Sequence, residues 1–226
     1  MSFAENCDLK RCDPGQVLAG VRGLIFDCDG VLFDTREVNR QFYNYILNGL
    51  GLPDMNDEDE EYVFMHTVDA SVARIVPSDL IGQAREIQMS MNYLDFMDRM
   101  IPAPGIHELL EALEKHGIMM AVNTNRKNSM EMVLDRFGMA RFFDPVMTAA
   151  KVARPKPDPE GVLHILDAWN FGPNEVAFLG DSAVDQETTV RSGVPFWAYR
   201  NPHLQANLHV DSFHELRQWV ERVFTR

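Results

Sequence analysis

Two aspartates in the segment GLIFDCDGVLFDT, residues 23–35, have the type and spacing of groups that do chemistry. An apolar run ends at Phe26, Asp27 and Asp29 follow two positions apart, and Gly30 comes next. One carboxylate can act as a nucleophile or a metal ligand, and a second beside it can move a proton. The short apolar run indicates a buried strand that brings both carboxylates to one point.

Further polar residues stand at or just beyond the ends of other predicted strands. These residues are Thr124, Asn125, Lys156, Asp181 and Asp185. In parallel sheets, ligands bind outside the carboxyl ends of the strands, near the point where the strand order reverses. We therefore expect these side chains to meet Asp27 and Asp29 in one crevice.

Such a crevice needs a cation, because clustered carboxylates repel one another. Oxygen ligands alone favour a hard ion, and Mg²⁺ fits well because it takes few carboxylates and keeps waters. Lys156 and Thr124 would then supply donors to a phosphoryl group. Arg154 is a second cation in the same segment, RPKPDPE. The prolines that flank Lys156 stiffen its loop, which favours an aimed side chain over an ordinary surface lysine.

The elements that must position these groups alternate between strand and helix after residue 101. This alternation predicts an α/β fold with a Rossmann-like, doubly wound and mainly parallel sheet. Residues 36–101 show helical spacing only, and we interpret them as an inserted all-helical domain in which a long helix begins at Ser78. The expected core comprises residues 21–35 and 102–226, and residues 1–20 are interpreted as an extension whose role stays open.

The chain has 226 residues and a formal net charge of −13. Phosphate polymers and anionic membranes repel such a surface, so we expect no nucleic-acid or membrane partner. Cys7, Cys12 and Cys28 are an odd number of cysteines, which favours reduced thiols, and two cysteines make a poor zinc site. No signal pattern or long apolar run is visible. We expect a cytoplasmic protein, either a monomer or a homodimer.

Four motifs carry a resemblance to a known family. In chain order they are DCDGVLFDT, VNTN, KPDPE and GDSAVD. Over residues 21–222 the chain resembles the haloacid dehalogenase superfamily. It is most similar to the branch of phosphoglycolate phosphatase and β-phosphoglucomutase, in which a helical cap is inserted into the core. The cap would be residues 36–101.

The resemblance implies a role for each motif residue. Asp27 would be the nucleophile that forms an aspartyl-phosphate, and Asp29 would act as general acid and then base. Thr124 would bind phosphoryl oxygens with help from Asn125, and Lys156 would hold the nucleophile and neutralise phosphate charge. The Mg²⁺ ligands would be Asp27, the carbonyl of Asp29, Asp181 and Asp185.

The motif residues favour one reaction over the others that the superfamily hosts. A dehalogenase needs neither the metal nor Asp29, and a phosphonatase of this branch uses a cap lysine, whereas residues 36–101 contain none. A phosphomutase tends to carry a histidine close behind the first motif, and none stands there. We expect hydrolysis of a small phosphate monoester. A phosphomutase and a catalytically idle binding protein are the alternatives.

Within the expected cap, three residues attract attention as possible contacts of the substrate. Arg74 is the candidate for binding the leaving group, with a solvated helix residue as the alternative interpretation. His66 is more typical of a packed or exposed histidine than of an acid or base, and the role of Thr67 stays open. The identity of the phosphate ester is not encoded in any motif.

Overall fold

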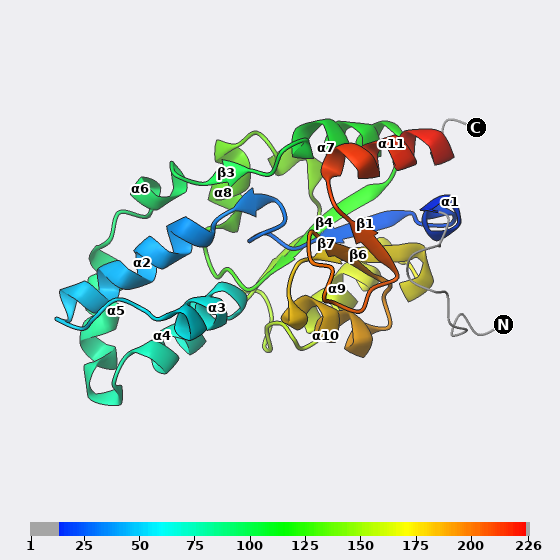
Figure 1. The fold of residues 1–226 in the computed structure, drawn as a ribbon. Helices are drawn as coiled ribbons and strands as arrows, with labels where there is room; N and C mark the ends of the chain where they lie inside the picture. Colours follow the sequence, from blue (N-terminus) through cyan, green and yellow to red (C-terminus); the bar gives the residue numbers. More distant parts are fainter. Residues whose placement is uncertain (1–13, 225–226) are drawn as a thin grey trace.

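The computed structural model describes residues 14–224, and its centre is a parallel sheet of six strands in the order β5-β4-β1-β6-β7-β8 (Figure 1). The strands of this sheet are β1 (Gly23–Phe26), β4 (Met119–Thr124), β5 (Val146–Thr148), β6 (Val176–Gly180), β7 (Phe196–Tyr199) and β8 (Leu208–Val210). The predicted α/β fold is confirmed. The order reverses at β1, which lies between β4 and β6.

Helices cover both faces of this sheet, because successive residues of a strand point to opposite sides. Leu24 and Phe26 of β1 face a core shared with α7 and α11, whereas Ile25 faces a core shared with α9. The helices around the sheet are α1 (Pro14–Leu18), α7 (Ile106–Lys115), α8 (Met130–Arg136), α9 (Glu160–Trp169), α10 (Ala183–Ser192) and α11 (Phe213–Phe224). Two 3₁₀ turns connect them, η2 (Ala140–Phe142) and η3 (Pro173–Glu175).

None of the helices in residues 14–224 is both long enough and apolar enough to cross a bilayer.

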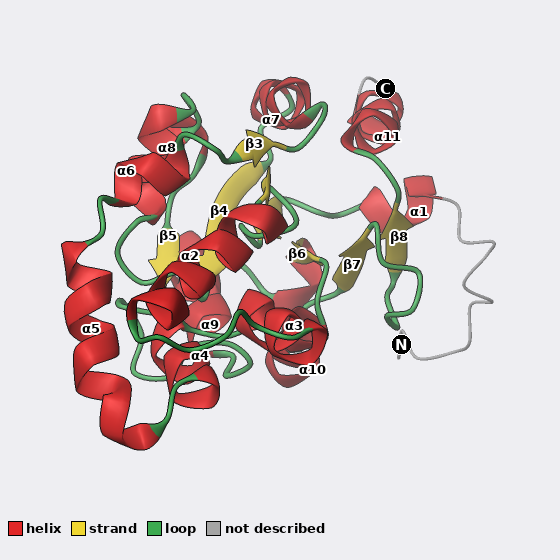
Figure 2. Ribbon diagram, turned by 60° about the vertical axis from the view of Figure 1, so that its left-hand side comes forward, coloured by secondary structure: helices red, strands yellow, loops and turns green. Residues whose placement is uncertain are grey.

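A helical segment stands at the carboxyl edge of the sheet (Figure 2). Its elements are α2 (Arg36–Gly49), α3 (Asp57–Met65), α4 (Val68–Ile75), η1 (Ser78–Leu80), α5 (Ile81–Ser90) and α6 (Tyr93–Met97). We call these elements the helical insert. The insert has an apolar cluster of its own, with Tyr43, Ile46, Val63 and Val72 among its buried members.

The expected long helix from Ser78 is wrong. Ser78 starts a 3₁₀ turn instead, and the helical backbone is interrupted after Ser90. Asn92 begins α6, because its side-chain oxygen accepts a hydrogen bond from the backbone nitrogen of Leu94. Such caps compete with continuation of the preceding helix.

Two short strands join the insert to the sheet. β2 (Phe33–Asp34) pairs antiparallel with β3 (Ile101–Pro102), so the chain leaves and re-enters the core at adjacent points. Neither strand was expected, because a strand of two residues is too short to show a hydrophobic period. Cys7 and Cys12 lie outside the described residues, and Cys28 is a buried free thiol.

Candidate active site

The carboxyl ends of β1, β4 and β6 place polar side chains at one edge of the sheet. Phe26 is in register with Val122 of β4 and with Leu179 of β6, so the three strands end at the same level. The backbone nitrogen of Asp27 donates to the carbonyl of Leu179, which fixes Asp27 one residue beyond the strand. Parallel pairing therefore sets the positions of the motif residues that directly follow β1, β4 and β6.

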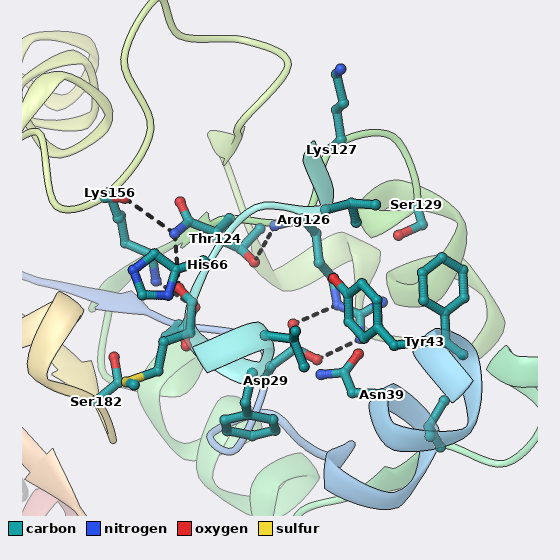
Figure 3. Close-up of a pocket in the computed structure, with 18 of the residues that line it drawn as sticks. Asp29, Asn39, Tyr43, His66, Thr124, Arg126, Lys127, Ser129, Lys156 and Ser182 are labelled. Atoms are coloured by element: carbon teal, nitrogen blue, oxygen red, sulfur yellow. Dashed lines mark hydrogen bonds and ion pairs between the residues drawn. The ribbon is translucent and has the colours of Figure 1, made fainter. Parts of the chain in front are cut away.

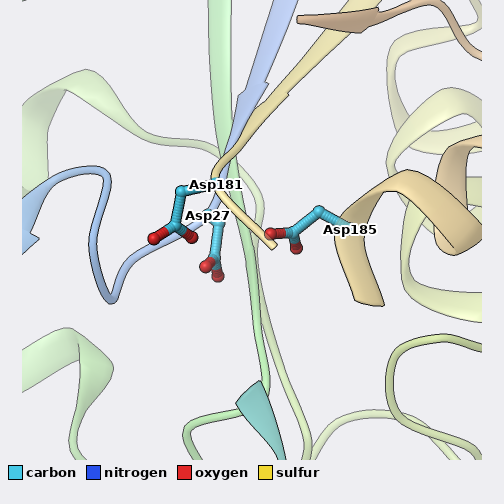
Figure 4. Close-up of side chains that lie close together, drawn as sticks. All are labelled: Asp27, Asp181 and Asp185. Carbon is cyan, nitrogen blue, oxygen red and sulfur yellow. The ribbon is translucent and has the colours of Figure 1, made fainter. Parts of the chain in front are cut away.

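Three carboxylates converge at this edge. Asp27, Asp181 and Asp185 each offer an oxygen, and these oxygens lie within 4.8 Å of one another (Figure 4). Burial, followed by the charges of Asp185 and Asp27, raises the pKa of Asp181. Burial also raises the pKa of Asp27 to about 7, although the nearby Lys156 opposes the shift. Burial and the neighbouring carboxylates thus disfavour negative charge on both side chains, which a bound cation would offset, and the donor set fits a hard divalent ion such as Mg²⁺.

Lys156 supplies a positive charge between two of these carboxylates. Its Nζ lies 2.7 Å from Oδ1 of Asp27 and 2.7 Å from Oδ1 of Asp185, and all three residues are buried. Burial alone would lower the pKa of Lys156, but the charges of Asp185 and Asp27 outweigh it and raise this pKa. The lysine is therefore held in its charged form. Arg154, by contrast, is exposed and pairs with Asp158.

Two glycines make room for the acidic cluster. A Cβ on Gly30 would lie 2.0 Å from Oδ2 of Asp181, and the φ of Gly30 is +80°. A Cβ on Gly180 would lie 2.5 Å from the Cβ of Asp185. Both contacts are shorter than carbon or oxygen atoms tolerate, so the absence of a side chain is what lets these carboxylates approach.

Asp185 is held from both sides. Lys156 binds its Oδ1, while Oδ2 accepts hydrogen bonds from the backbone nitrogen and the hydroxyl of Ser182, the latter at 2.6 Å. Ser182 in turn caps the first turn of α10 by accepting from the backbone nitrogen of Asp185. This reciprocal capping box fixes the carboxylate at the start of the helix.

Asp29 points to a different partner, Arg126. Nε of Arg126 lies 2.7 Å from Oδ2 of Asp29, and Nη2 lies 2.5 Å from Oδ1. The hydroxyl of Thr35 also donates to Oδ1, at 2.6 Å. Burial acts to raise the pKa of Asp29, but the charge and hydrogen bonds of Arg126 outweigh it and lower this pKa. Asp29 is therefore held as a carboxylate.

Thr124 and Asn125 end β4 beside the cluster. Thr124 is buried, and its Oγ1 accepts from the backbone nitrogen of Arg126. Nδ2 of Asn125 donates to two backbone carbonyls, that of Met65 at 3.0 Å and that of Lys156 at 3.2 Å. Both donated hydrogen bonds go to backbone carbonyls, so Asn125 links the sheet edge to the insert, and its contact with phosphoryl oxygens stays a prediction.

With this geometry in place, the chain can be compared with known proteins. A family model described as haloacid dehalogenase-like hydrolase matches residues 24–199. The chain belongs to the haloacid dehalogenase-like hydrolases. The match spans the strands that carry Asp27, Thr124 and Asp181, together with the whole helical insert.

Two named phosphatases and one solved structure align with most of this chain. N-acetylmuramic acid 6-phosphate phosphatase from Pseudomonas aeruginosa is 29% identical over 217 residues, covering 89% of this chain and 96% of that protein. Phosphoglycolate phosphatase from Nitrosospira multiformis is 24% identical over 190 residues, covering 76% of this chain and 80% of that protein. The crystal structure of a haloacid dehalogenase superfamily hydrolase, subfamily IA, variant 1, from Geobacter sulfurreducens is 34% identical, with a TM-score of 0.73 and coverage of 89% and 97%.

A pocket in the hydrolase lies between the acidic edge and the helical insert (Figure 3). Asp27, Asp29, Thr124, Lys156 and Asp181 line it from the core. From the insert it is lined by Val38, Asn39, Phe42, Tyr43, Val63, Phe64, Met65, His66, Val68 and Phe96. The floor is therefore charged, and the insert contributes a mainly apolar roof.

The expected contact of Arg74 with substrate is not supported. Arg74 does not line the pocket, and its guanidinium binds Glu58 at 2.8 Å and Asp59 at 3.2 Å on α3. An exposed arginine pairs with the nearest acids, and the first turn of α3 provides them. Thr67 caps α4 by accepting from the backbone nitrogen of Ala70.

His66 does line the pocket, and its ring is held in place. Its Nδ1 lies 2.8 Å from the carbonyl oxygen of Tyr62, and its ring stacks on that of Tyr62 with centroids 3.9 Å apart.

Three polar residues of the site were not expected from the sequence: Arg126, Ser182 and Thr35. Thr35 and Ser182 lie within motifs and Arg126 directly follows one, but only the tertiary structure tells where each side chain points.

Proposed function

We propose that the protein is a Mg²⁺-dependent phosphatase that hydrolyses a small phosphate monoester through an aspartyl-phosphate on Asp27. The observation that carries this proposal is the convergence of Asp27, Asp181 and Asp185, with the ammonium group of Lys156 bound to Asp27 and Asp185. Among the superfamily's reactions, attack on phosphorus is the one that uses such a cluster. The helical insert would serve as the cap over the leaving group.

In the first step, a carboxylate oxygen of Asp27 attacks phosphorus and the bond from phosphorus to the ester oxygen breaks. Oδ1 of Asp27 is bound by Lys156, which leaves Oδ2 for the attack. Asp29 has to be released from Arg126 and take up a proton before this step, and it then gives that proton to the departing ester oxygen, so that the alcohol leaves. Thr124 would donate to a phosphoryl oxygen, and Lys156 would offset part of the phosphoryl charge.

In the second step, water attacks the phosphorus of the aspartyl-phosphate, and Asp29 accepts a proton from that water. The acyl phosphate bond breaks, inorganic phosphate leaves and Asp27 is regenerated. The overall change is ester plus water to alcohol plus phosphate. Asp29 thus gives and takes one proton per cycle.

The residues present fit a magnesium ion. Asp27, Asp181, Asp185 and the backbone carbonyl of Asp29 would hold it, and Gly30 leaves the space that Asp181 occupies. Once bound, Mg²⁺ would offset negative charge on the phosphoryl oxygens and on the carboxylates.

The relatives support a small phosphorylated metabolite as substrate. The names N-acetylmuramic acid 6-phosphate phosphatase and phosphoglycolate phosphatase both denote a phosphate ester of an organic acid. A panel of phosphate esters should therefore include phosphorylated acids, phosphorylated sugars and pyrophosphate.

Phosphate release from this panel, with and without Mg²⁺, tests the proposal. Wild-type protein should release phosphate only when Mg²⁺ is present, and Asp27→Asn should abolish the release. Beryllium fluoride should bind as a phosphoryl mimic on Asp27, visible in a crystal structure. A mimic on another residue, or release that survives Asp27→Asn, would overturn the assignment. Inactivity across the panel would favour the idle binding protein.

A further inference from the structure

His66 is a firmly held polar side chain of the pocket, and the proposed mechanism gives it no task. It lies between α3 and α4, where the backbone becomes extended after Met65. Its imidazole ring is nearly parallel to the ring of Tyr62, at an angle of 4° and with centroids 3.9 Å apart. The carbonyl of Met65, the preceding residue, accepts a hydrogen bond from Asn125. Both the ring and the backbone next to it are therefore anchored.

The contact with Tyr62 also determines which ring nitrogen carries a hydrogen. Nδ1 of His66 lies 2.8 Å from the backbone carbonyl oxygen of Tyr62, in the last turn of α3. The last carbonyls of a helix have no partner within the helix, and a histidine side chain can satisfy one of them. A carbonyl oxygen only accepts, so Nδ1 donates, and in the neutral imidazole Nε2 then holds the lone pair. The end of α3 thus makes Nε2 a hydrogen-bond acceptor.

This acceptor is left for a ligand. The two nitrogens lie on different edges of the ring, so Nε2 turns away from α3 when Nδ1 turns toward it. His66 is half-buried and lines the pocket, and among the described residues its Nε2 has no hydrogen-bond partner. In Figure 3 its ring lies on the same side of the pocket as Lys156. A neutral acceptor of fixed direction therefore stands beside the charged floor.

The cations of the pocket have other work. Of the described residues that line it, three carry a permanent positive charge: Arg126, Lys127 and Lys156. Each of the three is paired with at least one carboxylate of the protein. The roof that the insert contributes is mainly apolar. In such pockets a few placed polar groups orient the ligand, and His66 is one of them.

We propose that His66 selects the substrate by accepting, at Nε2, a hydrogen bond from a hydroxyl group of the leaving group. This inference rests on the proposed phosphatase function and names its substrate class, the phosphate monoesters of polyols and sugars. An ionised phosphoryl or carboxylate oxygen has no hydrogen to give to Nε2, whereas a hydroxyl has one. The apolar roof contacts the carbon-bound hydrogens of such a leaving group. Esters without a free hydroxyl, phosphoglycolate among them, lack the contact with His66.

Matched esters test the proposal. Glycerol 3-phosphate is compared with propyl phosphate, and glucose 6-phosphate with cyclohexylmethyl phosphate, since the second member of each pair has a similar size and no hydroxyl. The ratio of kcat/KM within a pair is followed, because the hydroxyls also change the acidity of the leaving alcohol, and they do so in every variant alike. Wild-type protein with Mg²⁺ should favour the hydroxylated member in at least one pair. In His66→Phe that ratio should fall about 3- to 10-fold, as expected for one neutral hydrogen bond.

Three variants separate recognition from structure. His66→Phe keeps a ring that can stack on Tyr62, and His66→Asn keeps a donor near the position of Nδ1. Both lose the acceptor at Nε2 and should lower the ratio. His214→Phe changes an exposed histidine of α11 that does not line the pocket, and it should leave the ratio unchanged. Circular dichroism and thermal unfolding establish that each variant is folded, and if one His66 variant does not fold, the other is used.

A ratio near one in the wild type for both pairs would overturn the role of His66. A ratio that survives in the His66 variants would overturn it too, because a purely structural histidine would affect both members of a pair equally. Hydrolysis of phosphoglycolate without hydrolysis of the polyol and sugar esters would also contradict the proposal.

Failure of the phosphatase function looks different, because no ester would then be hydrolysed. In that case, titration calorimetry of the same pairs against wild-type protein and His66→Phe gives the ratio of dissociation constants. A preference for the hydroxylated esters that depends on His66 supports the hydroxyl site, and equal or absent binding overturns it.

Discussion

The side-chain nitrogen of Asn125 lies 3.0 Å from the carbonyl oxygen of Met65 and ties the edge of the sheet to the helical insert. The same nitrogen donates to the carbonyl of Lys156, so one side chain connects the insert with the loop that carries the buried lysine. Met65 ends α3, directly before the pocket residue His66. The position of the insert over the pocket and the position of the lysine are therefore coupled.

Removal of this link should weaken turnover. We expect Asn125→Ala to lower kcat/KM roughly tenfold, because it removes the two hydrogen bonds that connect the sheet edge with the insert and with the lysine loop. Asn125→Asp keeps the size but not the donors, and it should behave like the alanine variant in steady-state kinetics. Asn174→Ala, at an exposed position in η3, serves as the control. Wild-type kinetics in Asn125→Asp would show that the two donors are dispensable.

Gly30 should be essential for metal binding. In Gly30→Ala the new Cβ would meet Oδ2 of Asp181, so we expect the stabilisation by Mg²⁺ and the phosphatase activity to be lost. Gly138→Ala is the matched control, because its φ is +68° and nothing lies within 4 Å of its Cβ position. Both variants carry the cost of a left-handed alanine, about 1–2 kcal/mol. Thermal unfolding with and without Mg²⁺ separates that shared cost from the clash, and equal responses to Mg²⁺ would contradict the prediction.

The stabilisation of the folded protein by Mg²⁺ should depend on pH, because Asp27 titrates in the metal-free protein. Burial raises the pKa of Asp27 from 3.8 to about 7, so between these values the folded, metal-free protein holds a proton that the unfolded chain releases. The contribution of Asp27 to the free energy of unfolding therefore falls as pH rises through this window and is lowest above it. Mg²⁺ must displace that proton, so its stabilising effect should grow from about pH 5 to about pH 8.

The melting temperature with and without Mg²⁺, measured across this range, checks the prediction. The pKa of Asp181 is raised in the same direction, so some pH dependence should survive in Asp27→Asn, but less than in the wild type. If the increase in melting temperature caused by Mg²⁺ were constant with pH, or larger in acid, the predicted direction of the pH dependence would be wrong.

Asp29 should govern the rate rather than metal binding. We expect Asp29→Asn to slow turnover by ~10²–10⁴, because an amide cannot give or accept the proton. Its backbone carbonyl is unchanged, so stabilisation by Mg²⁺ should persist. Asp34→Asn changes an exposed aspartate in the same loop and should leave the rate near that of the wild type. Single-turnover kinetics would contradict the proposed role if Asp29→Asn reacted within a few-fold of the wild-type rate.

The sequence was sufficient for the sheet and for the residues at its carboxyl edge. Buried strands in a parallel sheet give continuous apolar runs, so their ends can be located, and parallel pairing brings Asp27, Thr124 and Asp181 to one level. Lys156 is preferred to Arg154 because KPDPE matches the motif of the family better, and in the structure Lys156 is buried against Asp27 while Arg154 is exposed.

The other features of the site depended on the directions of side chains, which hydrophobic periodicity does not encode. Arg126 lies in a loop, and its long side chain could have faced solvent, the insert or Asp29. Arg74 sits on an exposed helix face, and its guanidinium pairs with Glu58 and Asp59 of α3. The interruption at Asn92 was hidden because apolar residues continue on both sides of it, and only the cap reveals the break.

The paired strands β2 and β3 have a consequence for how such a protein can diversify. Phe33 lies opposite Pro102 and Asp34 opposite Ile101, so the two ends of the inserted segment are neighbours. A segment of any length whose ends meet at that spacing could be grafted there without disturbing the register of β1. The reactive carboxylates and the surface that selects an ester can thus be altered by separate genetic events, one by point substitution and the other by exchange of a whole cassette.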